Sequence, residues 1–365
     1  FSNEEGKNKS LFIHLTLVPY IQASGELKTK PTQHSVKELR SIGIQPDIII
    51  CRSEKIIPKE EKRKISLFCN VEPEHVVQSI DVKSIYEVPI KYDEEKLDKK
   101  ILNIFGLKDK NKANLKIWKD IIEKVNSKRK KVSIAIVGKY VDLKDAYKSL
   151  DEALIHGSLN NDVDLNTQWV DSTKINTKNV SEVLKNYSAI LIPGGFGVRG
   201  TEGKIDAIAY ARKYKVPFFG ICFGMQMAVI ESARNMLGIK KATSSEFGNS
   251  GTHVVGLMHE WVKGRDVQKG SEKNLGGTMR LGSYKAKLKK NSLISKIYKS
   301  NLIHERHRHR YEVNKDLKSK LEKKGLIFSG LSPDGLLPET IELENHPWFI
   351  GVQFHPEFKS RPFAP

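Results

Sequence analysis

The stretch Val216-Pro-Phe-Phe-Gly-Ile-Cys-Phe-Gly-Met-Gln226 begins as an apolar strand and runs directly into Gly220-Ile-Cys222-Phe-Gly224. The residues that follow have the apolar periodicity of a helix. Glycines two residues before and two residues after a central nucleophile form the nucleophile-elbow pattern, here with cysteine in place of serine. Because glycine permits a cramped turn, the pattern predicts that Cys222 is lifted above the edge of a sheet. A buried structural cysteine is the alternative.

A cysteine at the start of a helix lies close to unpaired N–H groups and to the positive end of the helix dipole, which favour the thiolate. Such a nucleophile needs a base, and the base needs a third group to orient it. The segment Gln353-Phe-His-Pro-Glu357 supplies both types of residue. His355 and Glu357 face the same way on an extended chain, and Pro356 favours that conformation at His355. Alone, however, this pattern is more typical of a surface histidine with satisfied hydrogen bonds.

A third segment, Pro193-Gly-Gly-Phe-Gly197, follows a predicted strand at a carboxyl end of the sheet. Open α/β sheets bind ligands at that edge. Residues without side chains leave backbone N–H groups accessible, and acyl transfer needs such donors for the developing oxyanion. A plain turn or a weak phosphate loop remains possible, although the Gly-Lys-Ser/Thr of a Walker motif is missing.

Short apolar runs alternate with helical patterns through much of the chain, which indicates crossover units and a parallel sheet. Near the N-terminus, strands are predicted over 46–51 and 65–69, and helices over 32–42 and 58–64. Farther along, strands are predicted over 132–138, 167–170, 188–193 and 216–221, with helices over 145–159, 180–186, 203–214 and from 223 onward. Residues 250–356 are richer in short strands. We predict an α/β fold whose domains are residues 1–92 and 132–365, joined by a charged linker over 93–131.

Composition narrows the possible classes of protein. No run approaches the ~18 apolar residues that span a membrane, and no signal peptide opens the chain. Three cysteines in no paired or metal-ligand pattern predict a reducing, cytoplasmic compartment and no metal site. The net charge of +19 would permit nucleic-acid binding, but the lysines are scattered rather than striped with aromatic residues. We therefore expect neither a nucleic-acid nor a membrane partner.

In this order, Pro-Gly-Gly-Phe-Gly, Gly-Ile-Cys-Phe-Gly-Met-Gln and Phe-His-Pro-Glu resemble the class I glutamine amidotransferases. The resemblance implies a flavodoxin-like glutaminase domain with a mostly parallel central sheet. It also implies a triad of Cys222, His355 and Glu357, with oxyanion donors at Gly195 and Phe223.

Longer strings narrow the resemblance to the CTP synthase family. They include His14–Tyr20, Lys28–His34, Lys64–Asn70, Gly276–Gly282 and Glu305–Glu312, and together they extend over essentially the whole chain. Residues 1–92 then resemble the C-terminal portion of a P-loop-type α/β synthetase domain. The family's activity is a ligase reaction that forms a C–N bond, in which ammonia from glutamine aminates UTP to CTP at the expense of ATP.

The resemblance also implies individual binding residues. The glutamine site would comprise Gly195, Phe223, Gly224, Met225 and Gln226, with Glu246 and Arg310 holding the amino and carboxylate ends. UTP, or CTP as feedback inhibitor, would contact Lys28, Thr29, Lys30, Pro31, Thr32, Gln33 and Lys64. The ATP adenine would lie along Ile80, Asp81 and Val82. Segments 138–140 and 145–148 resemble those linked to activation by GTP.

The resemblance further implies a homotetramer that uses ATP and Mg²⁺. The family's phosphate-binding loop and magnesium ligands have no counterpart before His14, so we expect only the glutaminase half to be complete in this chain. Three alternatives remain: another amidotransferase, which would lack the 28–34 string; a nucleotide-sensing or filament-forming relative without full activity; and a nucleic-acid-binding protein.

Overall fold

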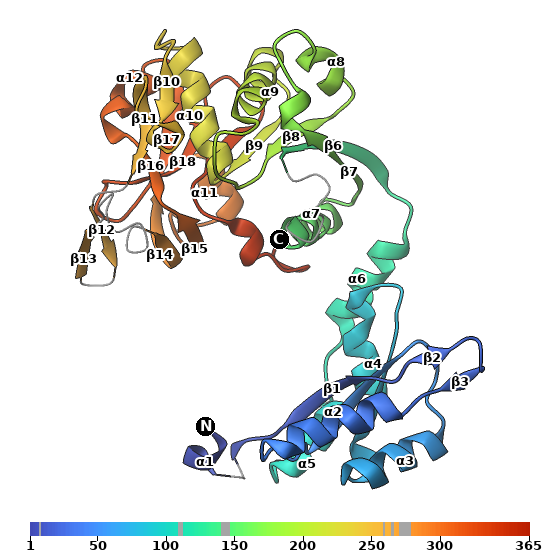
Figure 1. Ribbon diagram of the computed structural model, residues 1–365. Coiled ribbons are helices and arrows are strands. Elements are labelled where there is room, and N and C mark those ends of the chain that lie inside the picture. The colour runs from blue at the N-terminus through green and yellow to red at the C-terminus, as the bar shows by residue number, and fades with distance from the viewer. Residues whose placement is uncertain (7–8, 109–111, 140–146, 258–259, 264–265, 270–278) are drawn as a thin grey trace. The chain divides into compact units, whose positions relative to one another are not determined.

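The computed structural model describes residues 1–6, 9–108, 112–139, 147–257, 260–263, 266–269 and 279–365 (Figure 1). It divides into two compact units, Phe1–Ser127 and Lys128–Pro365. Each unit has its own parallel strands and its own buried apolar clusters. Parts of three predicted segments, residues 140, 145–146 and 276–278, lie outside the described residues.

The first unit is built on a parallel sheet with the strand order β1-β4-β5. Its strands are β1 (Ile13–Leu17), β4 (Ile48–Ser53) and β5 (Val76–Ile80). Helices α2 (Lys30–Ser41) and α3 (Lys59–Cys69) contribute to the apolar cluster that contains Ile49 and Cys51. Helix α5 (Leu97–Ile104) contributes to the cluster that contains Ile48 and Ile50. Because successive strand residues point to opposite faces, both faces of the sheet are covered.

Smaller elements complete the first unit: α1 (Ser2–Glu5), the hairpin β2 (Tyr20–Ile21) and β3 (Glu26–Leu27), α4 (Val88–Glu94) and α6 (Lys116–Asn126). Helices α5 and α6 fall within the segment predicted as a linker, and Leu97 of α5 is buried in the unit's core. The predicted domain boundaries stay predictions.

The strand predicted over 65–69 is wrong, because these residues form the last turns of helix α3. Ile65, Ser66 and Cys69 are buried, whereas Leu67 and Phe68 are exposed. That burial follows the helical period, so the apolar run is one face of a helix and not a buried strand. Asn70 ends the helix in the left-handed conformation with φ 54°. The strand that follows is β5, which the sequence analysis did not predict.

The second unit contains a larger sheet with the order β15-β14-β17-β18-β19-β9-β8-β6-β7. The parallel strands are β6 (Lys130–Gly138), β7 (Val163–Asp171), β8 (Ala189–Ile192), β9 (Phe218–Ile221) and β19 (Phe349–Val352). Antiparallel strands extend the sheet: β14 (Arg280–Leu288), β15 (Leu302–His309), β17 (Leu326–Leu331) and β18 (Pro338–Leu343). In chain order the parallel strands have the 2-1-3-4-5 arrangement of flavodoxin-like folds. The predicted fold class is confirmed.

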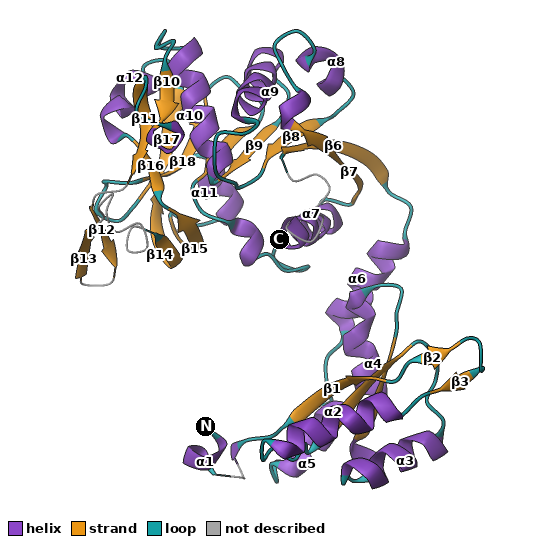
Figure 2. Ribbon diagram, in the orientation of Figure 1, coloured by secondary structure: helices purple, strands orange, loops and turns teal. Residues whose placement is uncertain are grey.

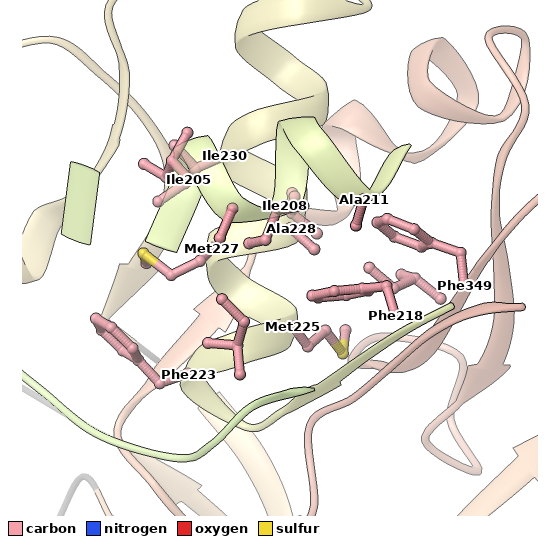
Figure 3. Packing of buried hydrophobic residues seen from close by; sticks show 14 of the residues in the cluster. Ile205, Ile208, Ala211, Phe218, Phe223, Met225, Met227, Ala228, Ile230 and Phe349 are labelled. Carbon is pink, nitrogen blue, oxygen red and sulfur yellow. The ribbon is translucent and has the colours of Figure 1, made fainter. Parts of the chain in front are cut away.

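Helices cover both faces of this sheet, giving three layers (Figure 2). Helices α9 (Thr201–Tyr214) and α10 (Phe223–Asn235) pack on one face, where Figure 3 shows their side chains together with Phe218 and Phe349. Helices α7 (Lys148–Asn160) and α11 (Leu293–Tyr298) pack on the other. The Phe218 and Phe349 ring centroids are 4.4 Å apart, which joins β9 to β19 beneath α10.

The other elements of the second unit are α8 (Val180–Leu184), α12 (Lys318–Glu322) and two small sheets. The small sheets contain β10 (Ala242–Ser244), β11 (Thr252–Leu257) and β16 (Tyr311–Val313), and the pair β12 (Glu260–Lys263) and β13 (Asp266–Lys269). Within the described ranges, no helix combines the length and apolarity needed to cross a membrane.

Candidate active site

Cys222 lies between β9 and α10, where the sequence pattern placed a sharp turn. Its backbone has φ 52° and ψ −101°, a conformation that a residue with a side chain rarely adopts. The Cys222 N–H donates to the Val352 carbonyl oxygen at 2.6 Å, which ties the turn to the end of β19. The fold therefore holds a strained cysteine at the carboxyl edge of the parallel sheet, where ligands bind in open α/β folds.

Glycines around Cys222 allow the chain to approach closely. A side chain at Gly220 would place its Cβ 2.8 Å from the Gly224 carbonyl carbon, and one at Gly224 would overlap the Ile192 carbonyl oxygen. On the facing loop, a Cβ at Gly194 would lie 2.7 Å from Cε1 of His355. Gly194 is therefore the residue whose missing side chain leaves room for the imidazole. The sequence identified the glycine loop but not this specific role.

His355 follows β19 and is 9% exposed. Its Nδ1–H donates to Oε1 of Glu357 at 2.7 Å. Burial alone would lower the pKa of His355, but the charge and hydrogen bond of Cys222, together with Glu357, outweigh burial and raise the pKa to about 10. Cys222 therefore interacts with His355, and His355 interacts with Glu357. The imidazole of His355 can hold a proton at neutral pH.

The glycine loop after β8 lies beside the first turn of α10. A Cβ at Gly195 would be 3.9 Å from Cδ1 of Phe223, so the two predicted oxyanion donors belong to adjacent segments. Phe223 is the first residue of α10, and the N–H groups of a first helical turn have no intrahelical acceptor. The arrangement can present two backbone donors above Cys222.

Glu246 lies next to the same loop. Its Oε1 accepts a hydrogen bond of 2.7 Å from the Gly197 N–H, and burial raises its pKa in spite of this bond. Tyr311 lies within electrostatic reach of both Glu246 and Arg310. The structure thus brings the two residues predicted for the ends of glutamine near one tyrosine.

The remaining predicted glutamine-site residues, Gly224, Met225 and Gln226, are buried in the first turns of α10. The Gln226 amide donates to the Tyr311 carbonyl oxygen at 2.8 Å and to Oε1 of Gln353 at 3.2 Å. Gln353 in turn donates from Nε2 to Sγ of Cys222 at 3.7 Å. No role for Gln353 was predicted from the sequence. A fully buried amide between apolar residues was the available signal, because such a group needs partners.

The residues predicted to bind UTP or CTP lie on the first unit. Lys28 pairs with Glu26 at 2.5 Å. Both Lys28 and Lys64 lower the pKa of Glu26, so the two ammonium groups lie near the same carboxylate. Thr29 precedes α2, and Lys30 begins it. The remaining three residues belong to the first turn of α2 and face differently: Pro31 is exposed, Thr32 is buried and Gln33 is half-buried.

The residues predicted to contact ATP adenine follow the sheet of the first unit. Ile80 ends β5, and Asp81 pairs with Arg52 at 3.1 Å. Val82 is half-buried. Across the described residues, no group of three or more His, Cys, Asp or Glu side chains could hold a metal ion.

A flavodoxin-like sheet with a strained cysteine elbow, a His–Glu pair and a facing glycine loop defines a class I glutamine amidotransferase domain. The family model described as glutamine amidotransferase class-I matches residues 142–365. A second model, described as CTP synthase N-terminus, matches residues 1–107. The chain belongs to the CTP synthase family.

Relatives that match over the whole chain are CTP synthases, in agreement with both family models. The CTP synthase of Pelagibacter ubique is 65% identical over 365 residues, which are 100% of this chain and 68% of that protein. The CTP synthase of Rhizobium meliloti is 56% identical over 364 residues, covering 100% of this chain and 67% of the relative. The chain thus spans about two thirds of these relatives. The glutaminase domain of Trypanosoma brucei CTPS, solved with bound acivicin, is 38% identical and covers 64% of this chain and 89% of its own, with a TM-score of 0.59.

Proposed function

We propose that the second unit hydrolyses glutamine with Cys222 as nucleophile, and that the ammonia serves the ATP-dependent amination of UTP to CTP. The observation that carries the proposal is the contact between a strained cysteine and a histidine that Glu357 orients. Membership of the CTP synthase family supports the synthetic half.

In the proposed reaction, the Cys222 thiolate attacks the side-chain carbonyl carbon of glutamine. The N–H groups of Gly195 and Phe223 stabilise the tetrahedral oxyanion. His355 gives its proton to the departing nitrogen, so ammonia leaves and a glutamyl thioester remains. The same imidazole then removes a proton from water, which attacks the thioester and releases glutamate. Glu357 holds His355 in the orientation that both transfers need.

Substrate binding follows from the charges beside the cysteine. We assign Glu246 to the amino group of glutamine and Arg310 to its carboxylate. The bond from the Gly197 N–H fixes one oxygen of Glu246 and leaves its negative charge beside the glycine loop. Gly224, Met225 and Gln226 would form the wall of the pocket from the first turns of α10.

On the first unit, we assign residues 28–33 and Lys64 to the uracil nucleotide, with CTP as competing inhibitor. Two lysines that share one carboxylate neighbour suit the charge of a triphosphate. We assign Ile80, Asp81 and Val82 to ATP. GTP as activator and a homotetrameric assembly belong to the same proposal. Mg²⁺ bound with ATP would supply charge neutralisation during phosphoryl transfer, and no described residue is assigned to hold it.

A glutaminase assay on the purified chain tests the first half of the proposal. We expect glutamate release by the unsubstituted chain and a loss of ~10³-fold or more in Cys222→Ala, because the nucleophile acts as a unit with its base. Cys69→Ala is the matched control, since Cys69 is a buried cysteine of the first unit. Equal rates in the unsubstituted chain and Cys222→Ala would overturn the assignment. A catalytically idle relative would release no glutamate at all.

A further inference from the structure

We propose that Gln353 is a catalytic residue whose side-chain N–H stabilises the Cys222 thiolate, and that Gln226 and the Tyr311 carbonyl hold it in the donating orientation. The inference deepens the proposed glutaminase function and rests on it. It begins from one contact, in which Nε2 of Gln353 lies 3.7 Å from Sγ of Cys222.

A glutamine amide can be turned either way, so its orientation must come from its partners. The Tyr311 carbonyl oxygen can only accept, and therefore Gln226 must direct its NH₂ group toward it, at 2.8 Å. The same NH₂ group then lies 3.2 Å from Gln353, which must present its oxygen to receive the second bond. Gln353 is left with its own NH₂ group facing the sulfur. Three successive contacts thus fix a donor at the nucleophile.

The backbone holds this chain of contacts in place. The Gln353 N–H donates to the Glu339 carbonyl oxygen at 2.8 Å, and the preceding residue, Val352, accepts from the Cys222 N–H. Gln353 is 0% exposed, and Gln226 is 3% exposed. Because water is excluded from these side chains, a hydrogen bond to a charged sulfur is stronger here than at a surface. If the Gln353 amide were turned by 180°, its oxygen would face the Cys222 thiolate and its NH₂ group would face the NH₂ group of Gln226.

The ionisable groups near the sulfur and near His355 must be considered in any pH experiment. His355 contacts it and is oriented by Glu357. From β15, His307 and His309 act on His355, but burial lowers the pKa of both. The cluster behind these histidines contains Arg280, Glu312 and Glu339. Gln353 is uncharged, so replacing it with another neutral residue changes the donor and adds no charge.

The experiment measures alkylation of Cys222 by iodoacetamide against pH, followed by mass spectrometry of the peptide that contains Cys222. Mass spectrometry separates this signal from Cys51 and Cys69, whose pKa values burial raises to about 11. We expect Gln353→Met to move the midpoint of the profile upward by about one pH unit and to slow alkylation about tenfold at pH values well below the midpoint. Well above the midpoint, the variant and the unsubstituted chain should react equally fast. A residue with a purely structural role would slow the reaction at every pH.

Two further variants keep the test decisive. Gln353→Glu has nearly the same shape but lacks the donor and carries a charge, so its midpoint should move further upward than that of Gln353→Met. Gln226→Met keeps Gln353 but frees its amide to turn, and an intermediate shift is expected. Thermal unfolding of each variant identifies any that fail to fold. If the folded variants among these three keep the profile of the unsubstituted chain, the inference is wrong.

The outcome is separable from the test of the glutaminase function. Alkylation requires no glutamine, so a shifted midpoint in a chain without glutaminase activity would preserve the thiolate contact and remove only the reaction. Glutaminase activity in the unsubstituted chain, together with unshifted midpoints in the variants, would support the reaction and contradict the role of Gln353.

Discussion

Two of the buried histidine–glutamate pairs in the second unit differ in the charge of the histidine. His355 donates to Glu357 at 2.7 Å and interacts with Cys222, and its pKa is raised to about 10. His307 lies 3.4 Å from Glu339, but burial lowers the pKa of His307 and raises that of Glu339. A glutamate neighbour alone therefore does not decide whether a buried histidine is charged.

The partners on the second nitrogen account for the difference. His309 must donate from Nδ1 to the Tyr311 carbonyl oxygen at 3.2 Å, which leaves its Nε2 as an acceptor. His307 donates to that nitrogen from Nδ1 at 2.9 Å, so its own Nε2 has no proton to offer Glu339. A protonated Glu339 would satisfy this nitrogen, and burial favours that form. By contrast, His355 interacts with Cys222 in addition to Glu357, and a Cys222 thiolate would carry the negative charge that stabilises a protonated imidazole.

The charge of the second cluster is instead carried by Arg280, which lies 3.3 Å from Glu312 and 2.5 Å from Glu339. Burial raises the pKa of Glu312 to about 8 even though Arg280 opposes the shift. We infer that the His355–Glu357 pair takes part in the reaction, whereas the cluster around Arg280 stabilises the fold.

The largest effect is expected from His355→Gln, which removes the proposed general base. Glutaminase activity should fall by ~10³-fold or more, because base and nucleophile act together. His309→Gln is the control from the other cluster, and its loss should stay below about tenfold. Steady-state glutamate release compares the two, and comparable losses would erase the distinction between the two groups.

Arg280→Met should instead destabilise the fold. Above about pH 8, where Glu312 is ionised, removing Arg280 leaves a buried carboxylate uncompensated, at a cost of about 3–5 kcal/mol. Urea unfolding measures the loss. The matched variant Arg280→Met/Glu312→Gln/Glu339→Gln removes the charges together and should recover most of the stability. No recovery in the triple variant would mean that packing, and not charge, holds this region.

The same Glu→Gln change should have opposite consequences in the two pairs. Glu357→Gln should lower kcat by about 10²-fold, because the amide no longer holds a charged imidazole. Glu339→Gln should change the free energy of unfolding by less than about 1 kcal/mol, since the amide can donate to His307 as a protonated carboxyl would. Steady-state kinetics and urea unfolding of both variants measure the two effects. A large loss of stability in Glu339→Gln would show that Glu339 is ionised.

Lys204 isolates the contribution of burial. It is 2% exposed, lies 4.9 Å above the Phe223 ring, and burial lowers its pKa to about 8. Below that pH the folded state must keep a buried ammonium, so Lys204→Met should stabilise the chain by roughly 1–3 kcal/mol at neutral pH. Between about 8 and 10.5 only the unfolded chain holds this proton, and the unsubstituted chain gains stability as pH rises. Urea unfolding at about pH 7 and about pH 9.5 should show the advantage of the variant shrinking. A constant advantage would exclude the charge as its cause.

The sequence predicted the glutaminase fold well because its strands are short apolar runs that alternate with helical patterns. It failed at residues 65–69, where an apolar run belongs to α3, since periodicity alone cannot separate five buried-looking residues into helix or strand. It also passed over β5, whose residues Gln78 and Ser79 interrupt the apolar pattern.

The candidate site was predictable where local pattern carries the chemistry, as at Cys222 and the His355-x-Glu357 segment. Contacts between distant segments were not. Gly194 and Gln353 gain their roles only because β8, β9 and β19 lie side by side in the sheet. The protonation of the buried cluster likewise depends on four strands that meet, which no single stretch of sequence records.

The most direct test of Cys222 as the nucleophile is to stop the reaction with acid during turnover and locate the covalent intermediate by mass spectrometry. The proposed reaction predicts a glutamyl thioester on Cys222, dependent on added glutamine and missing in Cys222→Ala. Glutamate release with the adduct on another residue, or sustained release in Cys222→Ala, would contradict it.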